Sequence, residues 1–553
     1  MKKKEKSLKN KTLREQTFLF GFIVQRKQLD GSIQISVRWL RIAAFLLVSL
    51  ILAWTGASSA LYLYLKYNKN YEEVSFVDTF LFRRAKLRTQ AGDQHIKKSI
   101  AEIEAGNYWD AFRLLHLGVA RSPNNLEGRK LLAEFYEVGR NRPDPAINYM
   151  LDGLDRGGIE DPDYLKYLLR LLLRHQKDAK VVEIANQYLP EEPEINQINS
   201  LLALGAATAN HLRGNYDQAD DYLIAYDLIN SPDGLLLSSK ISWDRGDKIA
   251  AITKLEQSLN RFPNSESLLI QLSNYYREIG EFDKARRYAI LRNIKDPLSV
   301  APKLELLYIY NQSGDTEREQ REIQRMFEQF SKNETAMLEF ANFSAKTGNV
   351  ELTRRIYELA LENEFNIGRF SILLMESHLA SEDYEGCLSF CEELIKEQPE
   401  WLTEHWAIFN GYRAVASFAV KRPDLGEIYL QHFLDETKNK PQAHLNVASN
   451  FSAIERNQQA HKVLTAAYKQ APTNQKILTE LIKVELKLGN TENLSQLLTR
   501  LLQMRRPQKE LLIDAYHKLG SDRFIFTQNR ETLLLQIGAF LRESDQSLPS
   551  TSL

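Results

Sequence analysis

A glycine corner recurs along this chain at a nearly constant interval, and that recurrence limits the fold more than any other feature. The stretch Arg245-Gly246-Asp247-Lys248-Ile249-Ala250-Ala251 is representative, because an acidic residue and then an amphipathic stretch follow the glycine. From Gly214 to Gly348, such corners follow one another at steps of about 32–34 residues. Such a period predicts stacked copies of one small unit, since each copy needs a neighbour to bury its apolar face.

The predicted corners cover most of the chain. Those with glycine are Gly106, Gly139, Gly214, Gly246, Gly280, Gly314, Gly348, Gly489 and Gly520. Those without glycine that keep the register are near Gln176-Lys177-Asp178, Glu382-Asp383, Arg422-Pro423-Asp424 and Arg456-Asn457. Together they predict about twelve units.

Two further markers accompany the corners. A proline follows many of them by about half a period, as at Pro123, Pro232, Pro263, Pro297, Pro399 and Pro472. A small residue follows by five, as at Ala111, Ala219, Ala251 and Ala285. Glycine relieves the backbone where one helix ends, Asp or Asn caps the next helix, and proline stops it. Each unit is therefore predicted to be helix, corner, helix.

These units resemble tetratricopeptide repeats, the helix–turn–helix family with a period of about 34 residues. The resemblance covers roughly residues 93–535. It implies an all-α fold, a right-handed superhelical solenoid whose first helices line the concave face. The small residue is replaced at Glu319, Thr353 and Leu494, and it comes late, at Ala146, after the Gly139 corner. We expect those units to pack more loosely or to bend the superhelix.

Composition agrees with a helical array. The chain has 553 residues, which exceeds the usual size of one compact core. Its 25 Gly and 16 Pro make up smaller fractions of the chain than the average shares of about 7% and 5%. Residues 1–41 carry eleven basic and three acidic side chains, a formal charge of +8, so the remainder is −8. That balance argues against binding of nucleic acid, and solvated helix faces account for isolated pairs such as Arg505-Arg506.

Residues 42–65 contain no charged side chain. A helix of this length reaches about 36 Å, enough to cross a hydrocarbon core of about 30 Å with some tilt. Residues 66–90 have a formal charge of +3, less than the +8 before the apolar run. The positive-inside rule then places the N-terminus in the cytoplasm and the array outside it, in the periplasm if the source is bacterial.

A cleaved signal peptide is the competing interpretation of this run. Small residues at Ala57-Ser58-Ser59-Ala60 would suit a signal peptidase. The long basic region before the run, and the apolar residues that continue through Leu65, favour an uncleaved transmembrane helix.

The predicted organisation has five parts. Residues 1–41 form a basic cytoplasmic tail, in which the apolar stretch 17–24 is too short to span and is placed against the cytoplasmic leaflet. Residues 42–65 form the membrane helix and residues 66–92 a helical linker. The solenoid occupies residues 93–535, and residues 536–553 form a polar, disordered end.

No catalytic or metal-binding motif emerges from the sequence. Cys387 and Cys391 are the two cysteines, and Cys387 occupies the small-residue position of its unit. Both are predicted to be buried packing residues. The ten histidines show no zinc-protease spacing, and neither a phosphate-binding glycine loop nor a nucleophile elbow occurs. We predict no cofactor, no metal and no intrinsic enzyme activity.

One recurrence on the first helices suggests a binding surface. Asn274, Asn342 and Asn450 lie six residues before their corners, and each precedes an aromatic residue, namely Tyr275, Phe343 and Phe451. In the family that the units resemble, asparagines of the concave face hold an extended peptide backbone through paired amide hydrogen bonds. The resemblance thus implies a peptide groove with these six residues as candidates. The competing interpretation is that exposed asparagines are ordinary on helical arrays. A grip on a free C-terminus is not expected, because Ile270, Leu338 and Asn446 stand where lysine would be needed.

The hypothesis from sequence is a membrane-anchored, non-catalytic scaffold that binds other proteins or peptides through the concave face of the solenoid. An accessory subunit of a polysaccharide synthesis or export assembly is the alternative, on analogy of layout alone. An enzyme with a site between repeats is the second alternative.

Overall fold

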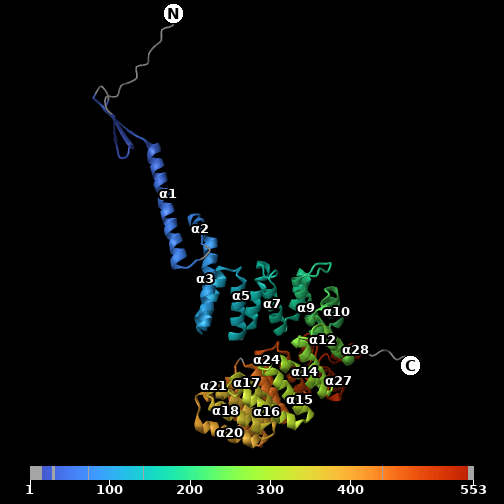
Figure 1. The fold of residues 1–553 in the computed structure, drawn as a ribbon. Helices are drawn as coiled ribbons and strands as arrows, with labels where there is room; N and C mark the ends of the chain where they lie inside the picture. The colour runs from blue at the N-terminus through green and yellow to red at the C-terminus, as the bar shows by residue number, and fades with distance from the viewer. Residues whose placement is uncertain (1–14, 28–30, 72–73, 141, 439, 546–553) are drawn as a thin grey trace. The chain divides into compact units, whose positions relative to one another are not determined.

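The computed structural model describes residues 15–27, 31–71, 74–140, 142–438 and 440–545 (Figure 1). The chain divides into two compact units, residues 1–171 and residues 172–553, here called unit 1 and unit 2. The division falls inside one helix, α7 (Pro162–Arg174).

Unit 1 begins with a three-stranded antiparallel sheet that we did not anticipate in the basic tail. Its strands are β1 (Glu15–Phe18), β2 (Ile23–Lys27) and β3 (Ile33–Val37), in the order β1-β2-β3. Alternation of apolar and polar residues along residues 33–37 is the period-two signal of a strand. Elsewhere the described part of the chain is all-α.

The apolar run forms the long helix α1 (Trp39–Leu63), which continues as a π-helical turn at Tyr64–Asn68. The helix is long and apolar enough to cross a membrane, by length and composition only, with a mean hydropathy of 1.9. It contains most of the predicted span 42–65 and starts three residues earlier. Ring contacts join the sheet to this helix, since Phe20 and Phe22 both lie against Phe45.

The segment after α1 turns back along it. Helix α2 (Phe76–Phe80) is capped by Ser75, and the Trp54 indole N–H donates to the Phe80 carbonyl oxygen over 2.8 Å. Helix α3 (Arg84–Glu104) then runs without a break through Gly92. A Cβ at Gly92 would lie 2.6 Å from the Ser122 nitrogen, so glycine permits a close helix crossing there. The expected boundary between linker and array at 92/93 thus falls inside a helix.

The rest of unit 1 consists of short helices. They are α4 (Tyr108–Arg121), α5 (Leu126–Glu134), a π-helical turn (Phe135–Gly139), α6 (Pro143–Leu151), a 3-10 turn (Leu154–Arg156) and α7. Gly106 is a left-handed corner at φ +79°. Gly139 is not, because it ends a π-helical turn and has no positive φ.

Unit 2 is built from helices joined in sequence by short corners. They are α8 (Asp178–Tyr188), α9 (Gln197–Arg213), α10 (Tyr216–Ala225), a 3-10 turn (Leu228–Asn230), α11 (Pro232–Asp244), α12 (Lys248–Arg261), α13 (Glu266–Glu278), α14 (Phe282–Lys295), α15 (Ala301–Ser313), α16 (Thr316–Phe330), α17 (Glu334–Lys346), α18 (Val350–Glu362), α19 (Ile367–Ala380), α20 (Tyr384–Glu397), α21 (Glu400–Ala419), α22 (Pro423–Glu436), α23 (Pro441–Ala453), α24 (Asn457–Gln470), α25 (Gln475–Leu488), α26 (Leu494–Leu502), α27 (Lys509–Gly520), a 3-10 turn (Asp522–Phe524) and α28 (Arg530–Asp545).

The corners of unit 2 confirm the predicted period. The left-handed corner residues are Gln176, Gly214, Gly246, Gly280, Gly314, Gly348, Glu382, Lys421, Glu455 and Gly489. The steps from Gly246 to Glu382 and from Lys421 to Gly489 keep the predicted period of about 34 residues. The step from Glu382 to Lys421 is longer, because α21 is 20 residues long. The predicted last corner at Gly520 is wrong, since the left-handed residue before α28 is Asn529.

The helices of unit 2 form two layers. Odd-numbered helices pack on one another in two series, one from α9 through α11 to α13 and the other from α15 to α27. Among the even-numbered helices, α26 packs on α28. The odd-numbered first helices therefore approach each other more closely and form the inner layer. Ala219, Ala251 and Ala285 at the small-residue position have no exposed surface, as predicted. Helix α28 extends to Asp545, so much of the expected disordered end is helical, and residues 546–553 lie outside the described residues.

The unit with threonine at the small-residue position is tightly packed rather than loose. Thr353 is 1% exposed, and its hydroxyl lies 2.7 Å from the Ser344 hydroxyl and 3.1 Å from the Ser377 hydroxyl. Threonine is accommodated because both neighbouring helices supply a hydroxyl partner for its polar atom.

Two glycine corners offer a matched test of this architecture. Gly280 has φ +79° and open space around a Cβ, whereas a Cβ at Gly214 would lie 2.8 Å from the Arg506 Cδ atom. We predict that Gly280→Ala lowers the free energy of unfolding by about 1–2 kcal/mol, the cost of a left-handed alanine. Gly214→Ala should cost more, because it adds a steric clash to the same backbone term. Denaturant titration of the full chain in detergent micelles measures both values, and equal losses would contradict the close approach at Gly214.

Candidate functional site

The corners define which residues of the first helices are equivalent. We call the residues six positions before each left-handed corner of unit 2, from Gly214 on, the inner row. They are Thr208, Lys240, Asn274, Tyr308, Asn342, Glu376, Val415, Ser449 and Lys483. All lie on odd-numbered helices, and all but Val415 have at least partly exposed side chains. The inner layer therefore presents a line of mostly polar side chains.

Two of the three predicted asparagines belong to this row. Asn274 and Asn342 are both partly exposed. The Asn274 side-chain oxygen accepts a hydrogen bond from Arg277 over 3.2 Å. Asn450 is not equivalent, because the left-handed residue of its corner is Glu455 and Ser449 takes the row position. The one-residue difference rotates Asn450 by about 100° around the helix away from the row.

The aromatic residues that follow these asparagines lie in the core. Tyr275 is 3% exposed, Phe343 1% and Phe451 0%. Tyr275 stacks on Trp243 with ring centroids 3.8 Å apart, and Phe343 meets Tyr308 edge to face at 4.7 Å. Their rings therefore offer almost no surface to the inner face, and their place in a peptide groove stays a prediction. Their role is to pack consecutive first helices together.

A cavity of unit 2 lies where its first and last helices meet. It has a volume of about 820 Å³ and is lined from α9 and α11 on one side and from α23, α25 and the segment before α27 on the other. Ser449 and Lys483 of the inner row line it, whereas Asn274, Asn342 and Asn450 do not. Ligand pockets commonly measure about 300–1,000 Å³. We call this cavity the closure cleft.

An arginine at the end of the array joins the two walls. The Arg505 guanidinium donates to both carboxylate oxygens of Asp178, over 2.8 and 2.7 Å, and also to the Leu173 carbonyl oxygen. Asp178 is nearly buried, with 5% of its side chain exposed. A paired, nearly buried fork of this kind is among the stronger polar contacts in proteins. We call this contact the clasp.

Backbone contacts support the clasp. The Arg506 N–H donates to the Leu212 carbonyl oxygen over 3.0 Å, and the Arg506 guanidinium lies 5.1 Å from the Tyr216 ring centroid. The Gln475 side chain donates to the Arg505 carbonyl oxygen over 2.8 Å. The prediction that Arg505-Arg506 lies on a solvated helix face is therefore wrong. Both residues hold distant parts of unit 2 together.

The corner at Gly246 borders the closure cleft as well. Arg245 pairs with Asp217 and Asp220, each over 2.6 Å, and so ties this corner to helix α10. His211 lies 2.9 Å from Asp244 on the neighbouring helix. These pairs fix side chains that line one wall of the cleft.

A carboxyl–phenol pair lies on the inner row, between the partly exposed Glu376 and the buried Tyr412. The Tyr412 hydroxyl donates to the Glu376 carboxylate, and Asn446 forms hydrogen bonds with both groups. Burial raises the pKa of Glu376, and the hydrogen bonds from Tyr412 and Asn446 oppose that shift. Burial and the adjacent carboxylate raise the pKa of Tyr412 well above its usual value. Through these contacts Glu376 joins α19 to α21 and α23.

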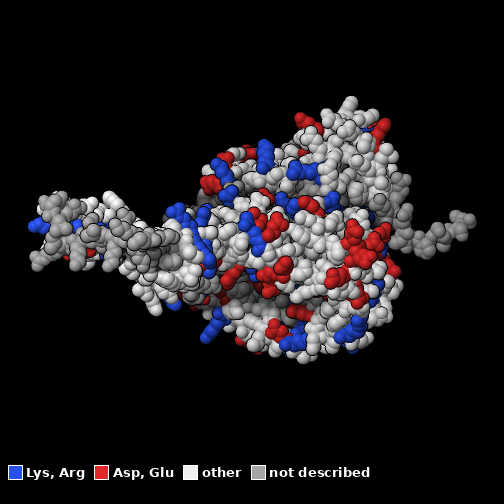
Figure 2. Space-filling view, turned by 90° about the horizontal axis from the view of Figure 1, so that it is seen from above, with Lys and Arg blue, Asp and Glu red and all other residues white. Residues whose placement is uncertain are grey.

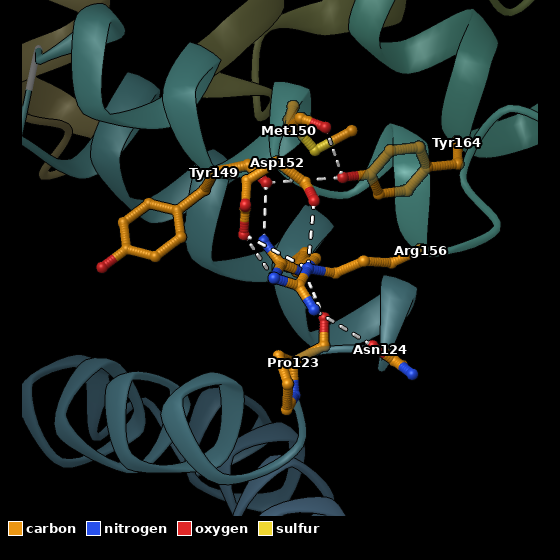
Figure 3. Close-up of polar contacts among 8 residues, drawn as sticks. Pro123, Asn124, Tyr149, Met150, Asp152, Arg156 and Tyr164 are labelled. Carbon is orange, nitrogen blue, oxygen red and sulfur yellow. Dashed lines mark hydrogen bonds and ion pairs between the residues drawn. The ribbon is translucent and has the colours of Figure 1, made fainter.

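Unit 1 contains a comparable network around Arg129, which is 2% exposed. Arg129 donates to the carbonyl oxygens of Pro123 and Tyr149 and to Asp152, while the Tyr164 hydroxyl donates to the Met150 carbonyl oxygen over 2.7 Å (Figure 3). Burial would raise the pKa of Asp152, but the hydrogen bonds from Arg129 and Arg156 lower it overall. Every Arg129 nitrogen has a partner, so the network braces α5, α6 and α7.

The cysteines are packing residues, as predicted. Cys387 and Cys391 are free and at most 1% exposed. Burial raises the pKa of the Cys391 thiol, which disfavours the reactive thiolate. Among the described residues, no group of three or more His, Cys, Asp or Glu side chains is placed to hold a metal ion.

Comparison with known proteins gives a likeness of fold alone. No protein-family model matches the sequence, and no curated protein matches it. The chain is similar to Naa15/Naa10 bound to HypK-THB, with 16% identity, 89% of this chain and 80% of that chain covered, and a TM-score of 0.28. It is similar to yeast Tom70, with 14% identity, 90% and 99% covered, and a TM-score of 0.32. A tetratricopeptide repeat protein from Parabacteroides merdae matches at 16% identity, with 45% and 96% covered and a TM-score of 0.27. At such scores nothing about partners follows, and the repeat assignment rests on the corners and layers of this chain.

We predict that the clasp stabilises unit 2 measurably. A double-mutant cycle with Asp178→Asn and Arg505→Gln should give a coupling energy of about 1–3 kcal/mol, because the pair is charge-assisted and nearly buried. The exposed pair Lys462–Glu427, with side chains 50% and 46% exposed, is the matched control and should give at most about 0.5 kcal/mol. Denaturant titration of the full chain measures both cycles. Equal coupling energies would show that the clasp does not hold the walls together.

Proposed function

We propose that this protein is a membrane-anchored, non-catalytic scaffold that binds other proteins or peptide segments along the inner face of unit 2. The observation that carries the proposal is the inner layer itself. Its first helices present a row of mostly polar, partly exposed side chains, interrupted at the buried Val415, that leads into a cleft of about 820 Å³. Stacked repeats bind partners through such extended surfaces.

The chemistry of the row suits a polypeptide backbone. Side-chain amides such as those of Asn274 and Asn342 both donate and accept, so they can pair with a peptide bond of any sequence. Basic and acidic side chains are interspersed on the face of the molecule seen in Figure 2, without a broad basic field. This distribution fits a protein partner better than a nucleic acid.

The anchoring part of the proposal is supported by α1 and its surroundings. Most apolar side chains of α1 are exposed, including Leu46, Leu50 and Leu52 at 60–69%. The sheet beside it also exposes apolar side chains, such as Phe20 at 90% and Ile35 at 65%. Exposed apolar area this large has a high free-energy cost in water. A lipid bilayer would cover both surfaces, and confinement to a membrane would raise the local concentration of clients.

Topology provides the test of the anchor. Because the segment before α1 carries the larger positive charge, we predict that a phosphatase fused after Leu553 is active, since it folds only outside the cytoplasm. A fluorescent reporter that folds only in the cytoplasm should be dark at the same position. The reverse pattern would overturn the orientation, and recovery of the protein in the soluble fraction would overturn the anchor.

Client capture provides the test of the inner row. We predict that combined Asn274→Ala, Asn342→Ala and Ser449→Ala substitutions weaken crosslinking of clients in intact cells by at least about tenfold, since each lost hydrogen bond costs about 0.5–1.5 kcal/mol. Helicity by circular dichroism should not change, because these side chains lie outside the core.

Asn450→Ala is the matched control for that experiment, because it removes a neighbouring amide that is off the row. It should leave capture unchanged. Equal losses from Asn450→Ala and from the triple variant would contradict the assignment of the row.

A further inference from the structure

The closure cleft carries more positive than negative charge. Six basic residues line it, namely Arg245, Lys476, Lys483, Arg505, Arg506 and Lys509, against the two acids Asp244 and Glu480. Asp178 pairs with Arg505, and Asp217 and Asp220 pair with Arg245, all from outside the lining. Glu480 pairs with Lys483 over 2.7 Å. Basic side chains thus outnumber the acids of the lining, with Lys476, Arg506 and Lys509 on the wall formed by the last helices.

The position of two of these lysines adds to the charge. Helices α25 and α27 both begin at the cleft, and Lys476 and Lys509 lie in their first turns. The N-terminal end of a helix is already positive, so acidic residues are favoured there and cations are disfavoured. The first turn of α25 contains no acidic residue, whereas that of α27 contains Glu510 beside Lys509. Lys476 thus stands where a cation costs stability, and a negatively charged ligand would offset that cost.

We propose that the closure cleft binds an acidic polypeptide segment of a partner. The proposal rests on the proposed function and names the chemical class of its partner. Carboxylates of the segment would pair with Lys476, Lys509 and Arg506, while Ser449, Thr479 and Gln508 offer hydrogen-bonding groups to its backbone. Because the two walls come from opposite ends of unit 2, the bound segment would contact both.

Fluorescence anisotropy with the full chain in detergent micelles tests the proposal. The probes are three labelled peptides of about ten residues, long enough to cross the cleft when extended, that differ only in carrying Glu, Gln or Lys at alternate positions. The Glu peptide should bind at least about tenfold more tightly than the Gln peptide, and that difference should shrink when salt rises from about 0.05 M to about 0.5 M. The Lys peptide should bind most weakly.

Charge reversal locates the site. Lys476→Glu combined with Lys509→Glu should weaken binding of the Glu peptide by about tenfold or more and should bring it level with the Gln peptide. Lys487→Glu is the matched control, because Lys487 is exposed on the same helix α25 but does not line the cleft. The affinity of the Lys487→Glu chain for the Glu peptide should stay within about twofold of that of the unmodified chain. This result would distinguish a local contact in the cleft from a general effect of net charge.

Each outcome decides one claim. Equal binding of the Glu and Gln peptides, or equal losses from Lys487→Glu and the double variant, would overturn the acidic ligand and leave the general polypeptide-binding function standing. Tighter binding of an oligothymidylate of matched charge that depends on the same two lysines would overturn it in favour of a nucleic acid. Failure of all peptides to bind, together with loss of client capture from intact cells, would overturn both the inference and the proposed function.

Discussion

A single residue in the left-handed conformation ends each first helix of unit 2 from α9 to α25, and the remaining architecture depends on it. The positive φ reverses the chain within two or three residues, so that the second helix packs back on the first. Where glycine occupies the corner, as at Gly280, the conformation carries no steric cost. Where Glu382 or Glu455 occupies it, packing of the two flanking helices holds an unfavourable backbone in place. Regularly spaced corners then put equivalent positions of successive helices in one line.

The corners were predictable because they depend on local chemistry, whereas the cleft was not. Period, glycine and capping residues identify the helix pairs, including the pair near Gln176 that lacks glycine. The predicted corner at Arg456, however, lies one residue after the left-handed residue Glu455. Asn450 was therefore assigned to the row position that Ser449 occupies. A corner without glycine does not itself reveal which residue is left-handed. The regular step between corners was the signal for this shift, because counting it back from Gly489 gives Glu455.

Contacts between distant segments escape sequence reasoning for a different reason. Nothing in the residues near Arg505 and Asp178 indicates that they meet, because their separation of 327 residues is set by the summed curvature of the whole inner layer. The same holds for Tyr412 and Glu376, which lie 36 residues apart on neighbouring first helices. The strands in residues 15–37 were missed for another reason. The alternation of apolar and polar residues is visible there, but the segment was interpreted only from its charge and its apolar content.

The clasp changes how the array shares its stability. In an open row of repeats each unit depends only on its neighbours, and the ends fray independently. Loop-closure entropy grows slowly with length, so bringing together residues 327 apart costs only about 2 kcal/mol more than closing a single repeat. A few hydrogen bonds can offset that difference. Once they form, the beginning and the end of unit 2 support each other, and truncation within its last helices would loosen α8 and α9 at the opposite end of its sequence.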